Sequence, residues 1–188
     1  MSATEVSICS NALLMLGAQP INDLTDDNDR ARIASNLFES QRDAVLRSHP
    51  WNCSVKRIAL APDAVAPAFD WDYAFTLPSD FMRALSVGQD GAQDEFTIES
   101  GKLLCNVNPA YLRYVWRNEN PATWDGMLVQ AMELQMAAAM AYGITQSASM
   151  RDSMRQEVAL FMKRARAVDG QDGSPEMLGN ERWLAARY

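Results

Sequence analysis

The sequence holds a single histidine, His49, which is followed directly by Pro50 and Trp51. An imidazole can serve as a general base near neutral pH, but nucleophilic catalysis also needs a serine or cysteine within its reach. No GxSxG, HExxH or phosphate-binding glycine-loop motif occurs in the sequence. We therefore expect His49 to cap or pack at a helix end, and we predict no catalytic residue.

Metal-binding side chains are also sparse in the sequence. The three cysteines are odd in number and far apart, which favours buried reduced thiols over a disulfide framework or a CxxC metal site. They are Cys9, Cys53 and Cys105. The acidic cluster of Asp26, Asp27 and Asp29 lacks the glycine and terminal glutamate of an EF-hand, so helix capping explains it better. We predict no metal and no cofactor site.

The histidine should be positioned by a helix over 27–48 and by the turn that follows it. The apolar residues at helical spacing are Ile33, Leu37, Phe38, Ala44 and Val45. The residues expected on the exposed side are Arg32, Glu39, Arg42, Asp43 and Arg47. Proline cannot continue a helix and pushes the preceding residue towards extended backbone. This predicts a structural corner at Pro50 and Trp51, with the indole of Trp51 as its apolar anchor.

Three further helices are predicted, over 3–16, 121–146 and 149–168. Ser2 and Glu5 have the spacing of a capping box for the first of them. Asn120 before Pro121 suits the start of the third helix along the chain, and Ser149 suits the start of the last. Short connections predict antiparallel helix pairs that form a bundle.

The middle of the chain, about 52–118, indicates strands. Apolar and polar residues alternate over 71–77 and 112–117, and 96–105 folds around Ser100 and Gly101 as a hairpin. We predict a small antiparallel β-sheet or hairpin portion here. The fold class is therefore α+β, mainly α, with a single domain over 1–168.

The last residues, 169–188, are predicted to form a flexible C-terminal tail. Three glycines and a proline within them disfavour a regular element. The tail nevertheless ends in aromatic and cationic residues, which are typical of interaction hot spots. We expect it to bind a partner through Arg182, Trp183, Leu184, Arg187 and Tyr188.

Composition limits the function classes further. The 188 residues are 48% hydrophobic and 22% charged, as in an ordinary globular domain, and the net charge is −7. A negative balance disfavours a surface that grips nucleic acid, because such surfaces gain affinity through Lys and Arg. The sequence has no apolar run of membrane-spanning length and no basic region at its start, so we expect a soluble protein made in the cytosol.

Several segments, taken in order, resemble the head-to-tail adaptor (connector) proteins of tailed bacteriophages, the tail tubular protein A-like family. The segments are ALLMLG with the proline and polar loop after it, ESQRDAVLRSHPWNCSVKRIAL, FTLPSDFMRAL, FTIESGKLLCN with LRYVWRN, and the alanine-rich helix. The resemblance runs from about Val6 to Met162. Its most specific part comprises Arg42, Leu46, Pro50 and Trp51.

The resemblance implies a structural virion protein at the head-tail junction, made in the host bacterial cytoplasm, with no enzymatic activity. Such proteins assemble as a ring, usually a dodecamer, beneath the portal protein. The ring continues the DNA exit channel towards a downstream tail protein (nozzle, tube or stopper), and DNA passes during ejection without sequence-specific binding. No membrane or cofactor is involved. The resemblance also implies that the C-terminal segment, with Arg182, Trp183, Leu184, Arg187 and Tyr188, docks onto the portal.

Two other function classes remain open. The chain could be a cytosolic helical interaction module that binds another protein through its C-terminus and has no connection with virions. It could also be an enzyme whose site is assembled from dispersed residues. In that case His49→Ala should abolish function without loss of stability, whereas formation of a ring-on-ring complex with portal rings indicates the adaptor.

Overall fold

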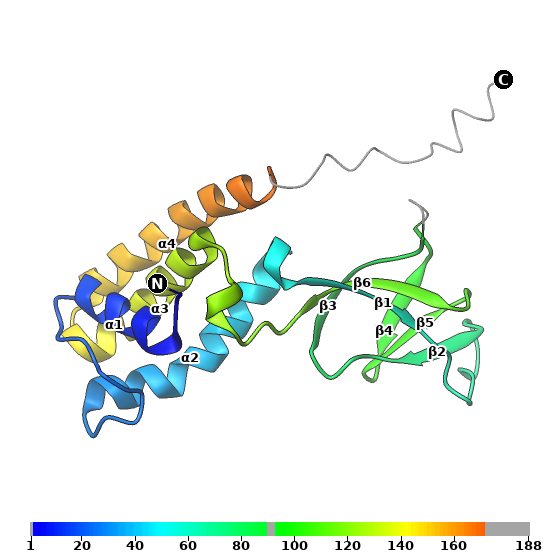
Figure 1. The fold of residues 1–188 in the computed structure, drawn as a ribbon, viewed down its shortest axis with the longest axis horizontal. Helices are drawn as coiled ribbons and strands as arrows, with labels where there is room; N and C mark the ends of the chain where they lie inside the picture. The colour runs from blue at the N-terminus through cyan, green and yellow to red at the C-terminus, as the bar shows by residue number, and fades with distance from the viewer. Residues whose placement is uncertain (1, 90–92, 172–188) are drawn as a thin grey trace. The chain divides into compact units, whose positions relative to one another are not determined.

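The computed structural model describes residues 2–89 and 93–171, and within them the chain has an α+β fold (Figure 1). These residues form four α-helices and two three-stranded antiparallel sheets, so the predicted fold class is confirmed at this level. The chain divides into two compact units. In the described residues, the helical unit comprises 2–53 and 118–171, and the sheet unit comprises 54–89 and 93–117. The single domain over 1–168 stays a prediction.

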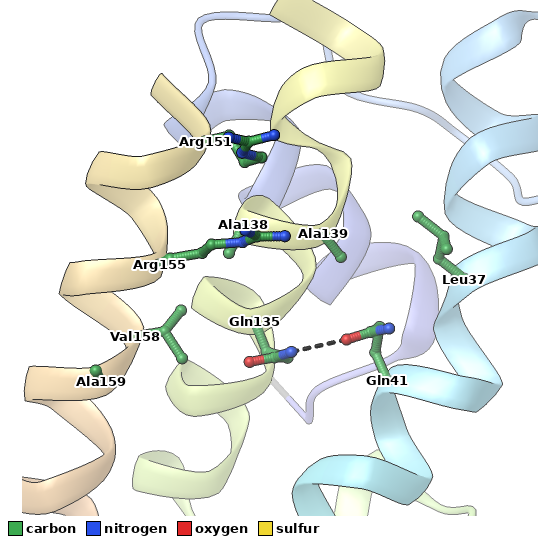
Figure 2. Close-up of a pocket in the computed structure, with 9 residues that line it drawn as sticks. All are labelled: Leu37, Gln41, Gln135, Ala138, Ala139, Arg151, Arg155, Val158 and Ala159. Atoms are coloured by element: carbon green, nitrogen blue, oxygen red, sulfur yellow. Dashed lines mark hydrogen bonds between the residues drawn. The ribbon is translucent and has the colours of Figure 1, made fainter. Parts of the chain in front are cut away.

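The helical unit is organised around α3 (Gly126–Thr145), which packs against the other three helices. These are α1 (Glu5–Met15), α2 (Asp29–Ser48) and α4 (Ala148–Asp169). Figure 2 shows α2 and α4 on either side of α3. Buried residues of α3 occur almost all round the helix, because its small alanines and flexible methionines let neighbours approach closely. They are Leu128, Ala131, Met132, Leu134, Met136, Ala137, Ala138, Met140 and Ala141.

Three predicted helix starts are wrong, and side-chain caps explain them. Helix α4 is capped by Ser147, not by the predicted Ser149: the Ser147 Oγ atom accepts from the Met150 backbone N–H at 3.2 Å. For α1 the capping box joins Thr4 and Ser7, not Ser2 and Glu5: the Thr4 Oγ1 atom accepts from the Ser7 backbone N–H at 3.1 Å. The predicted cap at Asn120 begins only a short 3-10 helix over Pro121–Thr123.

The start of α3 is fixed instead by Asp125. The Asp125 carboxylate accepts hydrogen bonds from the backbone N–H groups of Met127 at 2.7 Å and Leu128 at 3.0 Å. A charged acceptor that satisfies two free amides at the positive end of the helix dipole is a strong cap. The helix therefore begins at Gly126 rather than at the predicted residue 121.

Helix α2 ends at Ser48, as predicted, and His49 is extended. The prediction that Arg42 lies on the exposed side of this helix is wrong, because its side chain is buried. Arg42 follows Phe38 by four residues and precedes Val45 by three, so all three share one stripe of the helix. Its guanidinium is paired with the Asp43 carboxylate at 3.0 Å and lies 3.7 Å from a carboxylate oxygen of Glu119.

The sheet unit has two antiparallel sheets. One has the order β1 (Val55–Leu60), β6 (Ala110–Trp116) and β3 (Phe81–Val87). The other has the order β2 (Tyr73–Thr76), β5 (Lys102–Cys105) and β4 (Phe96–Glu99).

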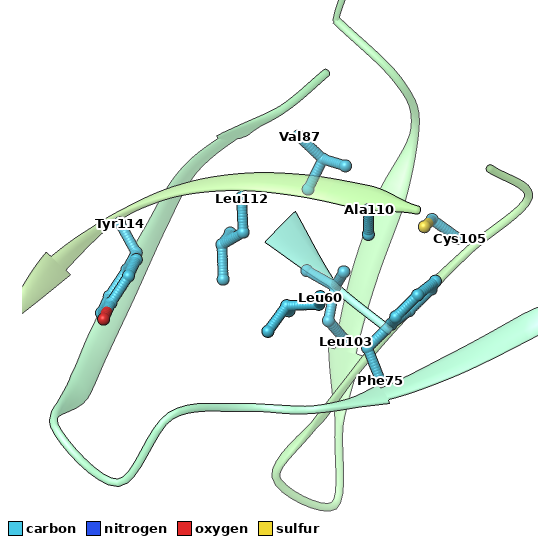
Figure 3. Packing of buried hydrophobic residues seen from close by; sticks show 8 residues of the cluster. All are labelled: Leu60, Phe75, Val87, Leu103, Cys105, Ala110, Leu112 and Tyr114. Carbon is cyan, nitrogen blue, oxygen red and sulfur yellow. The ribbon is translucent and has the colours of Figure 1, made fainter. Parts of the chain in front are cut away.

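Side chains from both sheets form one buried core (Figure 3). The core residues are Leu60, Phe75, Val87, Leu103, Cys105, Ala110, Leu112 and Tyr114. Leu112 and Tyr114 are both buried, as the alternation in the sequence predicts. The predicted hairpin is also present, since β4 pairs with β5 across the positive-φ residues Ser100 and Gly101.

Candidate functional site

The corner after α2 is rigid because Trp51 is fully buried within the helical unit. The Trp51 indole N–H donates to the backbone carbonyl of Val45 at 3.1 Å, which ties the residue after Pro50 back to the helix. The His49 ring meets the indole edge-on, with 4.9 Å between ring centroids. This arrangement satisfies the polar end of the indole while its rings fill the core.

The same corner holds the last residue of α4. The Asp169 carboxylate lies 2.9 Å from His49 Nε2 and accepts from the Asn52 backbone N–H at 3.1 Å. The Asn52 side-chain amide donates to the Asp169 carbonyl at 2.8 Å. Asp169 is buried, and its partners compensate for the cost of burying a carboxylate. His49 Nε2 is therefore engaged in holding α4, which favours a structural role for the histidine.

The residues predicted to dock on a partner lie outside the described residues. They are Arg182, Trp183, Leu184, Arg187 and Tyr188. The predicted tail over 169–188 begins at Asp169, which the structure places at the end of α4. The corner of His49, Asn52 and Asp169 thus fixes the point from which the C-terminal segment starts.

A groove of about 470 Å³ lies on α3 between α2 and α4 (Figure 2). It is lined by Leu37, Gln41, Gln135, Ala138, Ala139, Arg151, Arg155, Val158 and Ala159. The small side chains of Ala138 and Ala139 form its floor. One position along it is bridged by the Gln135 side-chain amide, which donates to the Gln41 side-chain oxygen at 2.7 Å.

Two arginines give this groove a positive charge. Arg151 Nε donates to the Asp152 carboxylate at 2.9 Å, and this hydrogen bond lowers the pKa of Asp152 from its ordinary value. Arg155, one turn further along α4, is exposed and adds to that lowering through its charge. Guanidinium groups above an apolar floor suit a ligand that combines carboxylates with apolar side chains.

Neither the role of Asp169 nor this groove is predicted by the sequence patterns. A signal for the groove was present, because Arg151, Arg155 and Val158 follow the spacing of one helix face. That spacing could not reveal that α2 and α4 lie on either side of α3. A signal for Asp169 was weaker, since only its place directly after the last apolar step of α4 suggested that it belongs to the helix.

The sheet unit has its own polar cluster, centred on Asp80. The Asp80 carboxylate accepts from Lys56 Nζ at 2.7 Å and from the Tyr114 hydroxyl at 3.0 Å, and Lys56 Nζ lies 3.5 Å from the centroid of the Trp116 ring. Burial alone raises the pKa of Asp80, but the hydrogen bonds from Lys56 and Tyr114 outweigh it, so its pKa lies below the ordinary value. Burial and the Asp80 carboxylate raise the pKa of Tyr114 to about 12.

Burial also raises the pKa of the Cys9 thiol to about 12, so this cysteine stays protonated at neutral pH.

Within residues 2–89 and 93–171, no three His, Cys, Asp or Glu side chains gather as they would around a metal ion. None of the helices in the same residues has the length and apolar character needed to cross a membrane. No protein-family model matches the sequence, and no curated protein sequence matches it.

Proposed function

We propose that this chain is a structural, non-enzymatic virion protein: a head-to-tail adaptor that forms a ring beneath a phage portal and continues the DNA exit channel into the tail. One observation carries the proposal. The residues on which the resemblance is most specific lie in the last two turns of α2 and in the corner that follows, where Arg42, Leu46 and Trp51 are all buried and Pro50 redirects the chain.

The arrangement of the chain supports the same proposal. The sheet unit is inserted between α2 and α3, so helices precede and follow it in the sequence, and the resembled family likewise combines a helical bundle with an antiparallel β portion. In the proposed assembly the helices form antiparallel pairs, and their bundle acts as a rigid body. The predicted C-terminal tail docks onto the portal in this assembly. Repeated around a ring, many weak contacts then act together.

Charge supports a role in a channel as well. A net charge of −7 gives little attraction to phosphates, and a channel wall that bound DNA tightly would hinder its passage. DNA therefore passes without sequence-specific binding in the proposed assembly. The downstream partner is the next tail protein, a nozzle, tube or stopper.

The proposal is tested by mixing the purified chain with portal rings and measuring complex mass by native mass spectrometry. We expect a complex with a fixed number of chains per portal ring. Deleting 172–188 should abolish this complex and leave the far-UV circular dichroism unchanged, because Asp169 and its contacts with His49 and Asn52 remain.

A narrower variant tests the aromatic residues of the segment. Trp183→Ala with Tyr188→Ala should weaken portal binding strongly, whereas Met177→Ala with Leu178→Ala, a matched pair in the same segment, should have a smaller effect. Portal binding that survives deletion of 172–188 would show that this segment is not the docking element. The absence of any complex with portal rings would reject the adaptor function.

A further inference from the structure

The groove on α3 continues beyond the residues that line it. Gln135, Ala138 and Ala139 are followed at the same helical spacing by Tyr142, whose side chain is 51% exposed. Tyrosine and arginine are the residue types most often found at interaction hot spots. The groove therefore joins an apolar floor to one exposed aromatic ring and to the guanidinium groups of Arg151 and Arg155.

Helix α1 lies on the opposite side of α3. The Asn11 side-chain amide donates to the Glu133 carboxylate at 2.7 Å, so Glu133 faces α1. Glu133 is two residues from Gln135, which places the two side chains about 160° apart around a helix of 3.6 residues per turn. In Figure 2 the faint blue ribbon of α1 accordingly lies behind α3, away from the labelled groove residues.

The surface at the end of α1 has the opposite character to the groove. Leu14 is 56% exposed and Met15 is 39% exposed, so two large apolar side chains are adjacent at this helix end. The loop that follows carries the carboxylates of Asp23, Asp26 and Asp27, and Asp29 is the first residue of α2. The side chains of Asp27 and Asp29 are almost fully exposed, and both carboxylates pair with the Arg32 guanidinium, at 3.4 Å and 3.5 Å. This surface, Leu14–Asp29, thus combines apolar side chains with carboxylates.

We infer that the groove binds the Leu14–Asp29 surface of a second copy of this chain. The Leu14–Asp29 surface offers carboxylates to Arg151 and Arg155, and apolar side chains to the alanine floor and Tyr142. The ion pairs that Asp27 and Asp29 make with Arg32, and Arg151 with Asp152, are exposed and contribute little, so these groups can exchange partners. Because the two surfaces are different parts of the chain, a contact that uses each of them once per copy is head-to-tail and repeats from copy to copy. Such a contact closes into a ring or extends as a filament. The inference rests on the ring of the proposed function and names the surfaces that build it.

The first test is self-association of the full chain without any portal, measured by sedimentation velocity over a range of concentrations. The wild-type chain should associate in a concentration-dependent manner. Arg151→Glu with Arg155→Glu should weaken association by about thirtyfold or more, the effect of one interface hot spot. Arg164→Glu is the matched control, because this exposed arginine lies nine residues along α4 from Arg155 and so about 180° around the helix. It should associate as the wild type does.

The second test is a rescue by charge exchange. Asp27→Lys with Asp29→Lys should also weaken self-association, while the control Glu39→Lys, on the side of α2 away from Leu37 and Gln41, should not. An equimolar mixture of the Lys variant and the Arg-to-Glu groove variant should regain association, because each surface then meets its opposite charge. Circular dichroism of every variant checks that the fold is retained.

Three results would overturn the inference: a wild-type chain that stays monomeric at every concentration, equal association of the groove variant and Arg164→Glu, or a mixture that fails to associate. These results are independent of the portal test. A chain that binds portal rings but does not use the groove for self-association rejects only this inference. A chain that self-associates through the groove but ignores portal rings supports this contact and rejects the adaptor function.

Discussion

The two units of this protein differ in where their most exposed large apolar side chains lie. In the sheet unit the large apolar residues of the strands meet between two sheets, and the most exposed ones, Val65 and Phe69, lie in the connection between β1 and β2. In the helical unit most large apolar side chains are buried as well, but the most exposed ones in the described residues, Leu14, Tyr142 and Leu160, lie on the helices themselves. Helix α4 has 22 residues, but only Ala165 and Asp169 are buried, and Leu160 is 70% exposed. Exposed side chains on a rigid element need little ordering before they bind, so the helical unit is the better platform for assembly.

The largest expected effect on the free energy of unfolding is that of Trp51→Ala, which tests how much the corner after α2 stabilises the helical unit. Trp51→Ala removes a fully buried indole and the hydrogen bond to Val45, and it should lower the free energy of unfolding by about 3–5 kcal/mol. Phe69→Ala, at a side chain that is 77% exposed, is the control and should stay within about 0.5 kcal/mol of the wild type. Urea denaturation followed by far-UV circular dichroism measures both.

The same urea denaturation of Phe75→Ala, a substitution in the core of the sheet unit, tests whether the two units unfold together. The chain leaves the helical unit after Cys53 and returns at Asn118, and the Asn118 side chain donates to the Cys53 carbonyl at 3.0 Å. A single domain over 1–168 then requires that Trp51→Ala and Phe75→Ala shift one common transition. Two transitions, each moved by only one of the substitutions, would contradict the single domain.

The second expected effect is intermediate and concerns the sheet unit. Tyr114→Phe removes one hydrogen bond to Asp80 and should cost about 1–2 kcal/mol at neutral pH. Because the folded pKa of Asp80 is lowered, its contribution is present above the ordinary aspartate pKa of about 4 and is lost as the pH falls through the folded value. The acid dependence of the urea midpoint should therefore be shallower in Tyr114→Phe than in the wild type.

The alkaline side provides an independent readout of the same hydrogen bond. The pKa of Tyr114 is raised to about 12, so its contribution to stability is present below the ordinary tyrosine pKa of about 10 and is lost as the pH rises through 12. In an absorbance titration of tyrosinate, the Tyr114→Phe variant should lack the component that titrates near pH 12. If both proteins titrate alike, the Asp80 cluster does not contribute as described.

The features predicted correctly from the sequence depend on local chemistry. Pro50 ends α2 wherever the rest of the chain lies, and the alternation at Leu112 and Tyr114 marks the buried face of β6. The start of α3 was misplaced because two local caps compete, and the carboxylate of Asp125 binds two amides where Asn120 begins only a short turn.

The features that were missed depend on contacts between distant parts of the chain. His49 and Asp169 are 120 residues apart in sequence, so neither residue reveals its partner. The groove requires α2 and α4 to pack on the same helix with two alanines between them, and no single segment encodes that arrangement. The position of Arg42 on a buried stripe could have been read from its spacing to Phe38 and Val45, but its charge suggested the exposed side.

The smallest expected effect on the free energy of unfolding is that of Arg155→Glu, and it tests whether this groove arginine contributes to folding. Arg155 is exposed, so Arg155→Glu should leave the free energy of unfolding within about 0.5 kcal/mol of the wild type. Arg42→Ala is the contrast within the same unit, because loss of a buried guanidinium with two carboxylate partners should cost about 1–3 kcal/mol. Urea midpoints of the two variants measure this difference. A loss of more than about 1 kcal/mol in Arg155→Glu would mean that the groove arginine supports the helices themselves, and weaker self-association of that variant would then reflect a damaged fold.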